Sequence, residues 1–196
     1  MPRKFLIPSL LAVSFAADAA LAHTGAGTVF GFSSGFQHPL GGLDHLLAMF
    51  AVGLLAAQPG GRAIWRVPGA FVGMMIVGAL VGLAGFELSG VELGIVVSIV
   101  AIALPVAFAL GMPAAPAMAY VGFFALFHGH AHGAELPVDA EAAPYIAGFA
   151  LATAIIHAAG VVAGLGIGRV DALRRSHGLR IAGALVAIAG LGLAVG

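Results

Sequence analysis

Six apolar segments, each long enough to cross a lipid bilayer, make up most of the chain after residue 38. A transmembrane helix needs about 20 predominantly apolar residues. Unpaired backbone polar groups are so costly in hydrocarbon that such segments must be helical or form a closed barrel. The expected spans are residues 39–57, 67–85, 90–110, 113–132, 143–166 and 179–195. The sequence therefore predicts an all-α, polytopic membrane protein with a six-helix transmembrane bundle.

The composition agrees with a membrane protein and excludes several kinds of chemistry. Hydrophobic residues make up 61% of the 196 residues and charged residues only 8%, which is far from the balance of a soluble domain. The absence of cysteine excludes disulfides, thiolate metal sites and cysteine nucleophiles. Eight basic residues balance eight acidic ones, so there is no polybasic surface of the kind that nucleic acid requires.

The first 22 residues have the features of a secretory signal peptide. A positively charged start precedes a short apolar stretch, and residues 20–22 match an A-x-A cleavage site. The mature chain would then begin at His23 and form one six-span domain, residues 23–196. The alternative is an uncleaved first transmembrane helix, but the apolar stretch is shorter than a span and Asp18 interrupts its end.

The arginines predict which loops face the cytoplasm. Arg62 and Arg66 lie between the first two spans, and the other arginines of the mature chain flank the loop between the last two. By the positive-inside rule, these loops are cytoplasmic. We therefore expect a multi-pass protein of the bacterial inner membrane with both termini in the periplasm.

One group of ionisable residues stands at the start of the first span. Placing a charged residue inside a bilayer costs about 2.5–3.5 kcal/mol on insertion scales, so such residues are functional candidates. The group comprises His38, Asp44 and His45. Pro39 suits the first turn of a helix, which would place His38 near the N-cap. Because His38 and His45 are seven residues apart, they should share one helix face with Asp44 beside them.

A second group lies where the fourth span ends. His128, His132 and Glu135 follow one another at helical spacing and should form one stripe, whereas His130 points elsewhere unless the helix unwinds. In the predicted topology this span ends at the periplasmic face, where the first span begins. The two groups can therefore form a single metal site.

Glycines at four-residue spacing predict close packing between helices. The sets are Gly69/Gly73, Gly78/Gly82, Gly129/Gly133 and Gly160/Gly164/Gly168. The glycines of the second histidine group would also allow local unwinding, which is common at transporter sites.

Further residues, His130 of the second motif among them, are candidates for a path or an accessory role. His157 lies in the middle of the fifth span. It could be a second station, that is, a further binding site for the ion along its path, or a proton acceptor. The alternative is a core histidine bonded to a backbone carbonyl or to a hydroxyl such as that of Thr153. His23 would combine a free α-amine with an imidazole, or simply be a mobile terminus. Glu87 and Glu92 bracket the second outer loop, and an acidic outer face would concentrate cations.

The ligand types favour a first-row divalent metal. Imidazole with carboxylate suits Ni, Co, Zn and Fe, whereas Mg or Ca would prefer an all-oxygen cage. The spacing alone does not choose among these ions. An intramembrane zinc-dependent hydrolase is the main alternative to transport, and a cytochrome with two axial histidines is a third. The acidic outer face, together with His157 in the middle of a span, favours a path for an ion across the membrane. We therefore expect a permease and not an enzyme.

The two histidine motifs resemble those of the HupE/UreJ family of nickel/cobalt permeases. The pattern H-P-x-x-G-x-D-H is matched from His38 to His45, with Gly42 at the fifth place, and F-H-G-x-A-H-G-x-E is matched from Phe127 to Glu135. His130 occupies a variable place. The resemblance implies an inner-membrane permease that supplies nickel or cobalt for hydrogenase or urease maturation. The ion would be the transported substrate, and no prosthetic group is implied.

Overall fold

The computed structural model describes residues 31–136, 140–171 and 177–195, and every regular element in these ranges is an α-helix. The helices are α1 (Gly31–Gly41), α2 (Leu43–Ala57), α3 (Ala63–Leu83), α4 (Val91–Ala107), α5 (Ala114–Ala134), α6 (Ala142–Asp171) and α7 (His177–Val195). The predicted all-α class is confirmed. The proposed signal peptide and His23 lie outside the described residues.

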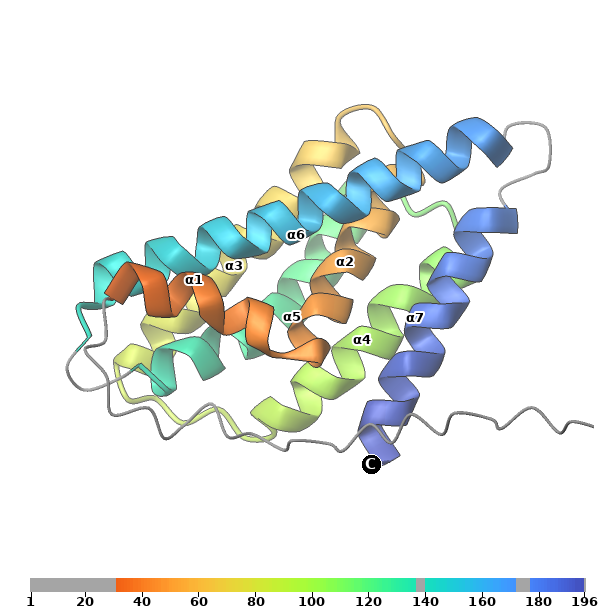
Figure 1. The fold of residues 1–196 in the computed structure, drawn as a ribbon. Coiled ribbons are helices and arrows are strands. Elements are labelled where there is room, and N and C mark those ends of the chain that lie inside the picture. The colour runs from red at the N-terminus through yellow and green to blue at the C-terminus, as the bar shows by residue number, and fades with distance from the viewer. Residues whose placement is uncertain (1–30, 137–139, 172–176, 196) are drawn as a thin grey trace, which may run out of the picture.

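Helix α2 forms the centre of the bundle, as Figure 1 shows. It packs against α3, α4 and α6, and every residue from 51 to 57 is buried. The other helices pack in pairs around it, α3 with α5, α4 with α7, and α1 with α6. Because α2 has no solvent-facing side over these residues, its sequence is apolar all round.

The outer surface of the bundle carries large apolar side chains on several helices. Trp65 is 77% exposed, Leu93 is 68% exposed, Val162 is 70% exposed and Ile188 is 64% exposed. In water such a surface would drive association, whereas in lipid it is the expected exterior of a helix bundle. The surface therefore agrees with a membrane protein.

Each predicted apolar segment contains a helix, but the helices differ in their capacity to span a bilayer. Within the described residues, three are long and apolar enough: α3, α6 over Ala142–Arg169, and α7. The pair α1 and α2 adds a fourth if it counts as one bent span. Helix α4 is apolar but has 17 residues, and the histidine motif occupies the last turns of α5. Six membrane crossings stay a prediction.

The start of the first span differs from the prediction. Gly42 adopts an extended conformation (φ −105°, ψ 123°) and separates α1 from α2, whose axes differ by 82°. Pro39 therefore lies near the end of α1, not in the first turn of α2, and His38 is in the last turn of α1 rather than near an N-cap. The expectation that His38 and His45 share one helix face was wrong, because the chain turns between them.

Two glycines hold α1 across α6 and so fix the direction of this turn. A Cβ atom at Gly35 would collide with the carbonyl group of Tyr145, and one at Gly148 would collide with the carbonyl oxygen of Phe32. The two backbones can approach this closely only because neither glycine has a side chain. The α1–α6 contact is what sets the position of His38.

Glycines also join α5 to α3. A Cβ atom at Gly129 would collide with the carbonyl oxygen of Met75, and one at Gly133 with that of Ala79. Helix α5 is continuous from Ala114 to Ala134, so the alternative of local unwinding at the histidine motif was wrong. The glycines of this motif serve close packing instead.

The other spaced glycines divide into two groups. Gly78 and Gly82 face the backbone of α5, and Gly160 and Gly164 face α2. In contrast, nothing lies within 4 Å of the place where a Cβ would stand at Gly69, Gly73 or Gly168, so the packing prediction was wrong there. These last three are on open surface, where four-residue spacing has no packing partner.

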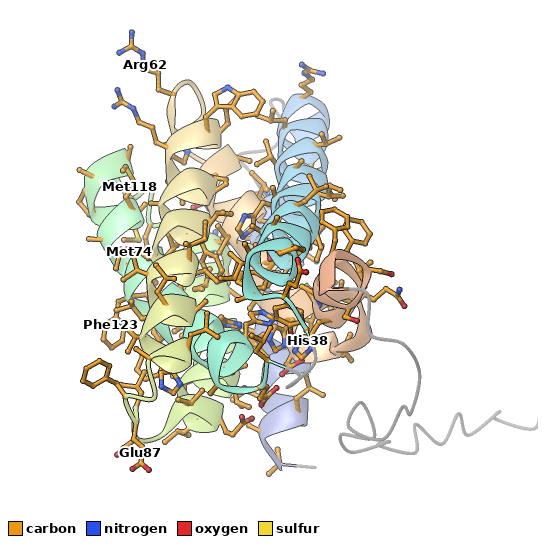
Figure 2. The ribbon with its side chains drawn as sticks, turned by 90° about the vertical axis from the view of Figure 1, so that its left-hand side faces the viewer. His38, Arg62, Met74, Glu87, Met118 and Phe123 are labelled. Atoms are coloured by element: carbon orange, nitrogen blue, oxygen red, sulfur yellow. The ribbon has the colours of Figure 1, made fainter. Side chains whose placement is uncertain are left out.

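The charged loops lie at opposite ends of the bundle. Figure 2 shows Arg62 at one end and Glu87 at the other, with His38 toward the end that carries Glu87. The acidic loop and the first histidine motif therefore share one end of the molecule, as the predicted topology requires.

Candidate metal site

Three imidazoles from three helices converge near the acidic end of the bundle. His38 comes from the last turn of α1, His45 from the first turn of α2 and His132 from the last turn of α5. One ring nitrogen from each lies within 4.8 Å of the other two. The ring centroids of His38 and His132 are 4.7 Å apart, and those of His45 and His132 are 5.2 Å apart. The two sequence motifs thus meet.

The spacing of these nitrogens is suitable for one metal ion. Donor atoms around a tetrahedral ion at about 2.1 Å lie roughly 3.4 Å from one another. Small rotations of the three rings would bring nitrogens that lie within 4.8 Å of one another to this separation. The arrangement can therefore supply three neutral nitrogen donors and leave further positions for water.

Asp44 contacts His45 and orients its ring. The Nδ1–H of His45 donates to Oδ1 of Asp44 at 3.0 Å, and the backbone N–H of His45 donates to the same oxygen at 2.8 Å. The Nε2 atom is buried and has no hydrogen-bond partner among the described residues. A carboxylate that holds one ring nitrogen fixes the tautomer and leaves the other nitrogen for a metal.

Gly42 makes room for this pair, a role that the sequence analysis missed. A Cβ atom at position 42 would lie 2.5 Å from Oδ1 of Asp44 and 3.2 Å from Nδ1 of His45. The fifth place of the first motif therefore has a steric reason for glycine, beyond the break between α1 and α2.

Aromatic side chains of α6 form a wall of the site that the sequence analysis also missed. The His132 ring stacks on Phe149, with centroids 4.5 Å apart and planes 11° from parallel. Tyr145, one turn earlier, lies edge-on to His38 at 6.3 Å. His132 is fully buried, and neither of its ring nitrogens has a partner among the described residues. The four-residue spacing of the two aromatics on a helix was the available signal.

His128 lies next to the three-imidazole group on its inner side. Its ring is 5.1 Å from that of His45 and 5.6 Å from that of Phe71. Its Nε2 atom is 2.8 Å from Oγ of Ser98, and this hydroxyl lies 2.6 Å from the carbonyl oxygen of Ile95. Ser98, on α4, was not singled out from the sequence because a lone serine in an apolar helix carries no spacing signal.

The remaining candidates are not among the three imidazoles that converge. Glu135 is exposed at the C-cap of α5, and Glu87 and Glu92 are exposed on the α3–α4 connection and at the start of α4. His130 is buried and its Nε2 atom is 2.7 Å from the carbonyl oxygen of Phe86, so it points elsewhere, as its position on the helix predicted. The carboxylates give this end of the bundle a negative rim.

His157 is fully buried in α6 and does not belong to the three-imidazole group. Its ring lies edge-on to Phe71, 5.0 Å away. The prediction that His157 lies apart from the outer group agrees with this position, and its proposed place on the path stays a prediction.

The profile of the family described as HupE / UreJ protein matches residues 11–193. The chain belongs to the HupE/UreJ family. Both histidine motifs of the candidate site lie within the matched residues.

A curated member of the family is similar over most of its length. Protein HupE of Rhizobium leguminosarum bv. viciae is 44% identical over 167 residues, which is 85% of each chain. No solved structure matches the chain. Family membership and the apolar helices support a membrane protein with a role related to nickel or cobalt transport.

Proposed function

We propose that this HupE/UreJ protein is a permease that carries nickel, and also cobalt, across the bacterial inner membrane into the cell. The observation that carries the proposal is the convergence of His38, His45 and His132, whose ring nitrogens lie within 4.8 Å of one another at the acidic end of an apolar bundle. The metal would serve hydrogenase or urease maturation, as the family resemblance implies.

The donor set supports nickel and cobalt as substrates. Three imidazoles exclude the hard, oxygen-loving ions, and affinity at nitrogen sites rises from cobalt to nickel in the divalent series. We propose that His38, His45 and His132 bind the ion directly and that Asp44 acts through the Nδ1–H of His45. His128 is the next donor on the inner side.

The exposed carboxylates would act before the ion reaches the imidazoles. Glu87, Glu92 and Glu135 are all exposed and would raise the local concentration of divalent cations through their charge. We propose Glu135, which follows His132 in the second motif, as the group that passes the ion from this rim to the histidines.

The membrane potential is sufficient to drive the uptake. A divalent ion that moves inward through 100 mV gains about 4.6 kcal/mol, or roughly three decades of accumulation. This direction requires the histidine end of the bundle, and with it both termini, to be periplasmic. The positions of Arg62 and Glu87 at opposite ends support this orientation.

Uptake of radiolabelled nickel into proteoliposomes, with an inside-negative potential, tests the function. The wild-type protein should accumulate nickel, cobalt should compete, and His45→Ala should lower the initial rate at least about tenfold. His130→Gln is the matched control, because His130 is also a buried histidine, on α5, but its Nε2 atom bonds the Phe86 carbonyl group instead of joining the three imidazoles. Nickel uptake that equals that of empty liposomes would refute the permease.

The same preparation distinguishes transport from hydrolysis. Three histidines with an open position could also hold a catalytic zinc ion. Zinc-loaded protein should leave the liposome lipids and a set of membrane peptides intact. Hydrolysis that is lost in His45→Ala would favour the enzyme instead.

A double variant tests whether the two motifs form one site. Members of one site are not additive, so His45→Ala/His132→Ala should bind nickel little more weakly than either single variant. Isothermal titration of the four proteins measures this. Losses in affinity that multiply would indicate two independent sites.

A further inference from the structure

Within the described part of the chain, His157 has no hydrogen bond that would explain its place in the core. It is 1% exposed, and neither ring nitrogen has a partner among the described residues. The neighbouring hydroxyl of Thr153 points to the sulfur of Met75 at 3.8 Å instead. A buried imidazole with two unpaired nitrogens is costly, so this histidine requires another explanation than core packing.

A second imidazole contacts the same phenylalanine as His157. The rings of His128 on α5 and His157 on α6 both pack against Phe71, at 5.6 Å and 5.0 Å. His128 also lies 5.1 Å from His45. The ring contacts therefore run from the three-imidazole group through His128 and Phe71 to His157, toward the middle of α6.

The hydrogen bonds of Ser98 decide which nitrogen of His128 is available. The Ser98 hydroxyl donates its hydrogen to the carbonyl oxygen of Ile95 at 2.6 Å. Its oxygen must then accept the Nε2–H of His128, 2.8 Å away. In this tautomer the Nδ1 atom carries a lone pair, and Nδ1 is buried without a partner among the described residues.

We propose that Nδ1 of His128 and a ring nitrogen of His157 form a second, deeper station for the transported divalent ion. This inference rests on the proposed function and extends it. The ion leaves the three-imidazole group through His128, which contacts His45 on one side and Phe71 on the other. Two nitrogen donors bind less tightly than three, and a weaker second site allows the ion to leave the first and continue inward.

Nickel binding and nickel uptake, measured on the same variants of the full chain, test the second station. In detergent, the wild-type protein should show a tight and a weaker class of bound nickel by equilibrium dialysis. His157→Gln should remove the weaker class, leave the tight class within about twofold, and slow proteoliposome uptake about tenfold. His130→Gln, a buried histidine bonded to the Phe86 carbonyl group, should change neither measurement.

A second variant covers the case in which His157→Gln does not fold. Ser98→Ala removes one oxygen atom and should weaken the deeper class and slow uptake in the same way, because His128 loses the acceptor that fixes its tautomer. Retention of both nickel classes and of the uptake rate in the folded variants would overturn the second station while the permease stands. If the wild-type protein takes up no nickel, the proposed permease function is refuted. The binding measurement then still decides on the second station, because His157→Gln either loses the weaker class of bound nickel or retains it.

Discussion

Gly42 shows how a residue without a side chain takes part in the candidate site. It ends α1, begins α2 in an extended conformation, and leaves the space that the Asp44 carboxylate occupies beside the His45 ring. Because these roles are steric, a substitution at Gly42 can test them without replacing any of the histidines proposed to bind the metal.

Gly42→Ala should weaken nickel binding about tenfold, because its Cβ atom would lie 2.5 Å from Oδ1 of Asp44 and force the carboxylate from the His45 ring. Gly41→Ala is the matched control, since nothing lies within 4 Å of a Cβ atom there. Isothermal titration with nickel measures both. Equal affinity in the two variants would contradict the steric role of Gly42.

The role of Asp44 can be tested by comparing two substitutions. If the carboxylate acts by accepting the Nδ1–H of His45, Asp44→Asn keeps an acceptor oxygen and should lose less nickel affinity than Asp44→Ala, which should lose about 10–100-fold. If Asp44 binds the ion directly, both variants lose the charged donor and should be equally weak. The ratio of the two dissociation constants decides between these roles.

At the level of helices, backbone contacts at glycines determine where the histidines stand. Gly129 and Gly133 hold α5 against the carbonyl groups of α3, and Gly35 holds α1 against α6. His128 and His132 belong to the first contact and His38 to the second. The positions of the metal donors therefore depend on close backbone contacts at residues that have no side chain.

Gly129→Ala should lower the free energy of unfolding by about 1–3 kcal/mol, because the added methyl group overlaps the Met75 carbonyl oxygen and separates α5 from α3. Gly73→Ala, on the open surface of α3, should leave stability nearly unchanged. Denaturant titration in mixed micelles measures the difference. Equal stabilities would show that α3 and α5 tolerate a wider separation.

The sequence predicted the helices better than the turn between the first two. Hydropathy located every apolar segment, because a bilayer imposes length and composition on a span. The break at Gly42 was missed because Pro39 fits equally well in the first turn of a helix or, as observed, within α1. What decides between them is the contact of Gly35 with the Tyr145 carbonyl group, which lies far away in the sequence.

The convergence of the two motifs was predictable, whereas their geometry was not. The predicted topology places both motifs at one face, and in the structure His38, His45 and His132 lie together. The roles of Ser98 and Phe149 depend on neighbours in space, so no spacing rule could predict them. The same holds for the hydrogen bond from His45 to Asp44, which makes this carboxylate a positioning group in the described geometry.

For the whole molecule, the direction of transport depends on which end faces the periplasm. The end with Glu87 and the histidines must be outside if the potential is to draw cations inward through the site. The opposite end carries Arg62, which the positive-inside rule assigns to the cytoplasm. An inverted bundle would present the acidic rim to the cytoplasm and oppose uptake.

Single cysteines can test this orientation on a clean background, because the chain has no cysteine of its own. Ser89→Cys, in the acidic loop, should react with an impermeant thiol reagent in intact spheroplasts. Pro59→Cys, exposed in the α2–α3 loop that carries Arg62, should react only after the membrane is permeabilised. Both variants should retain nickel uptake, since neither residue belongs to the three-imidazole group. Labelling of Pro59→Cys in intact spheroplasts, with Ser89→Cys protected, would show that the bundle has the opposite orientation and that the acidic end is the exit of the path.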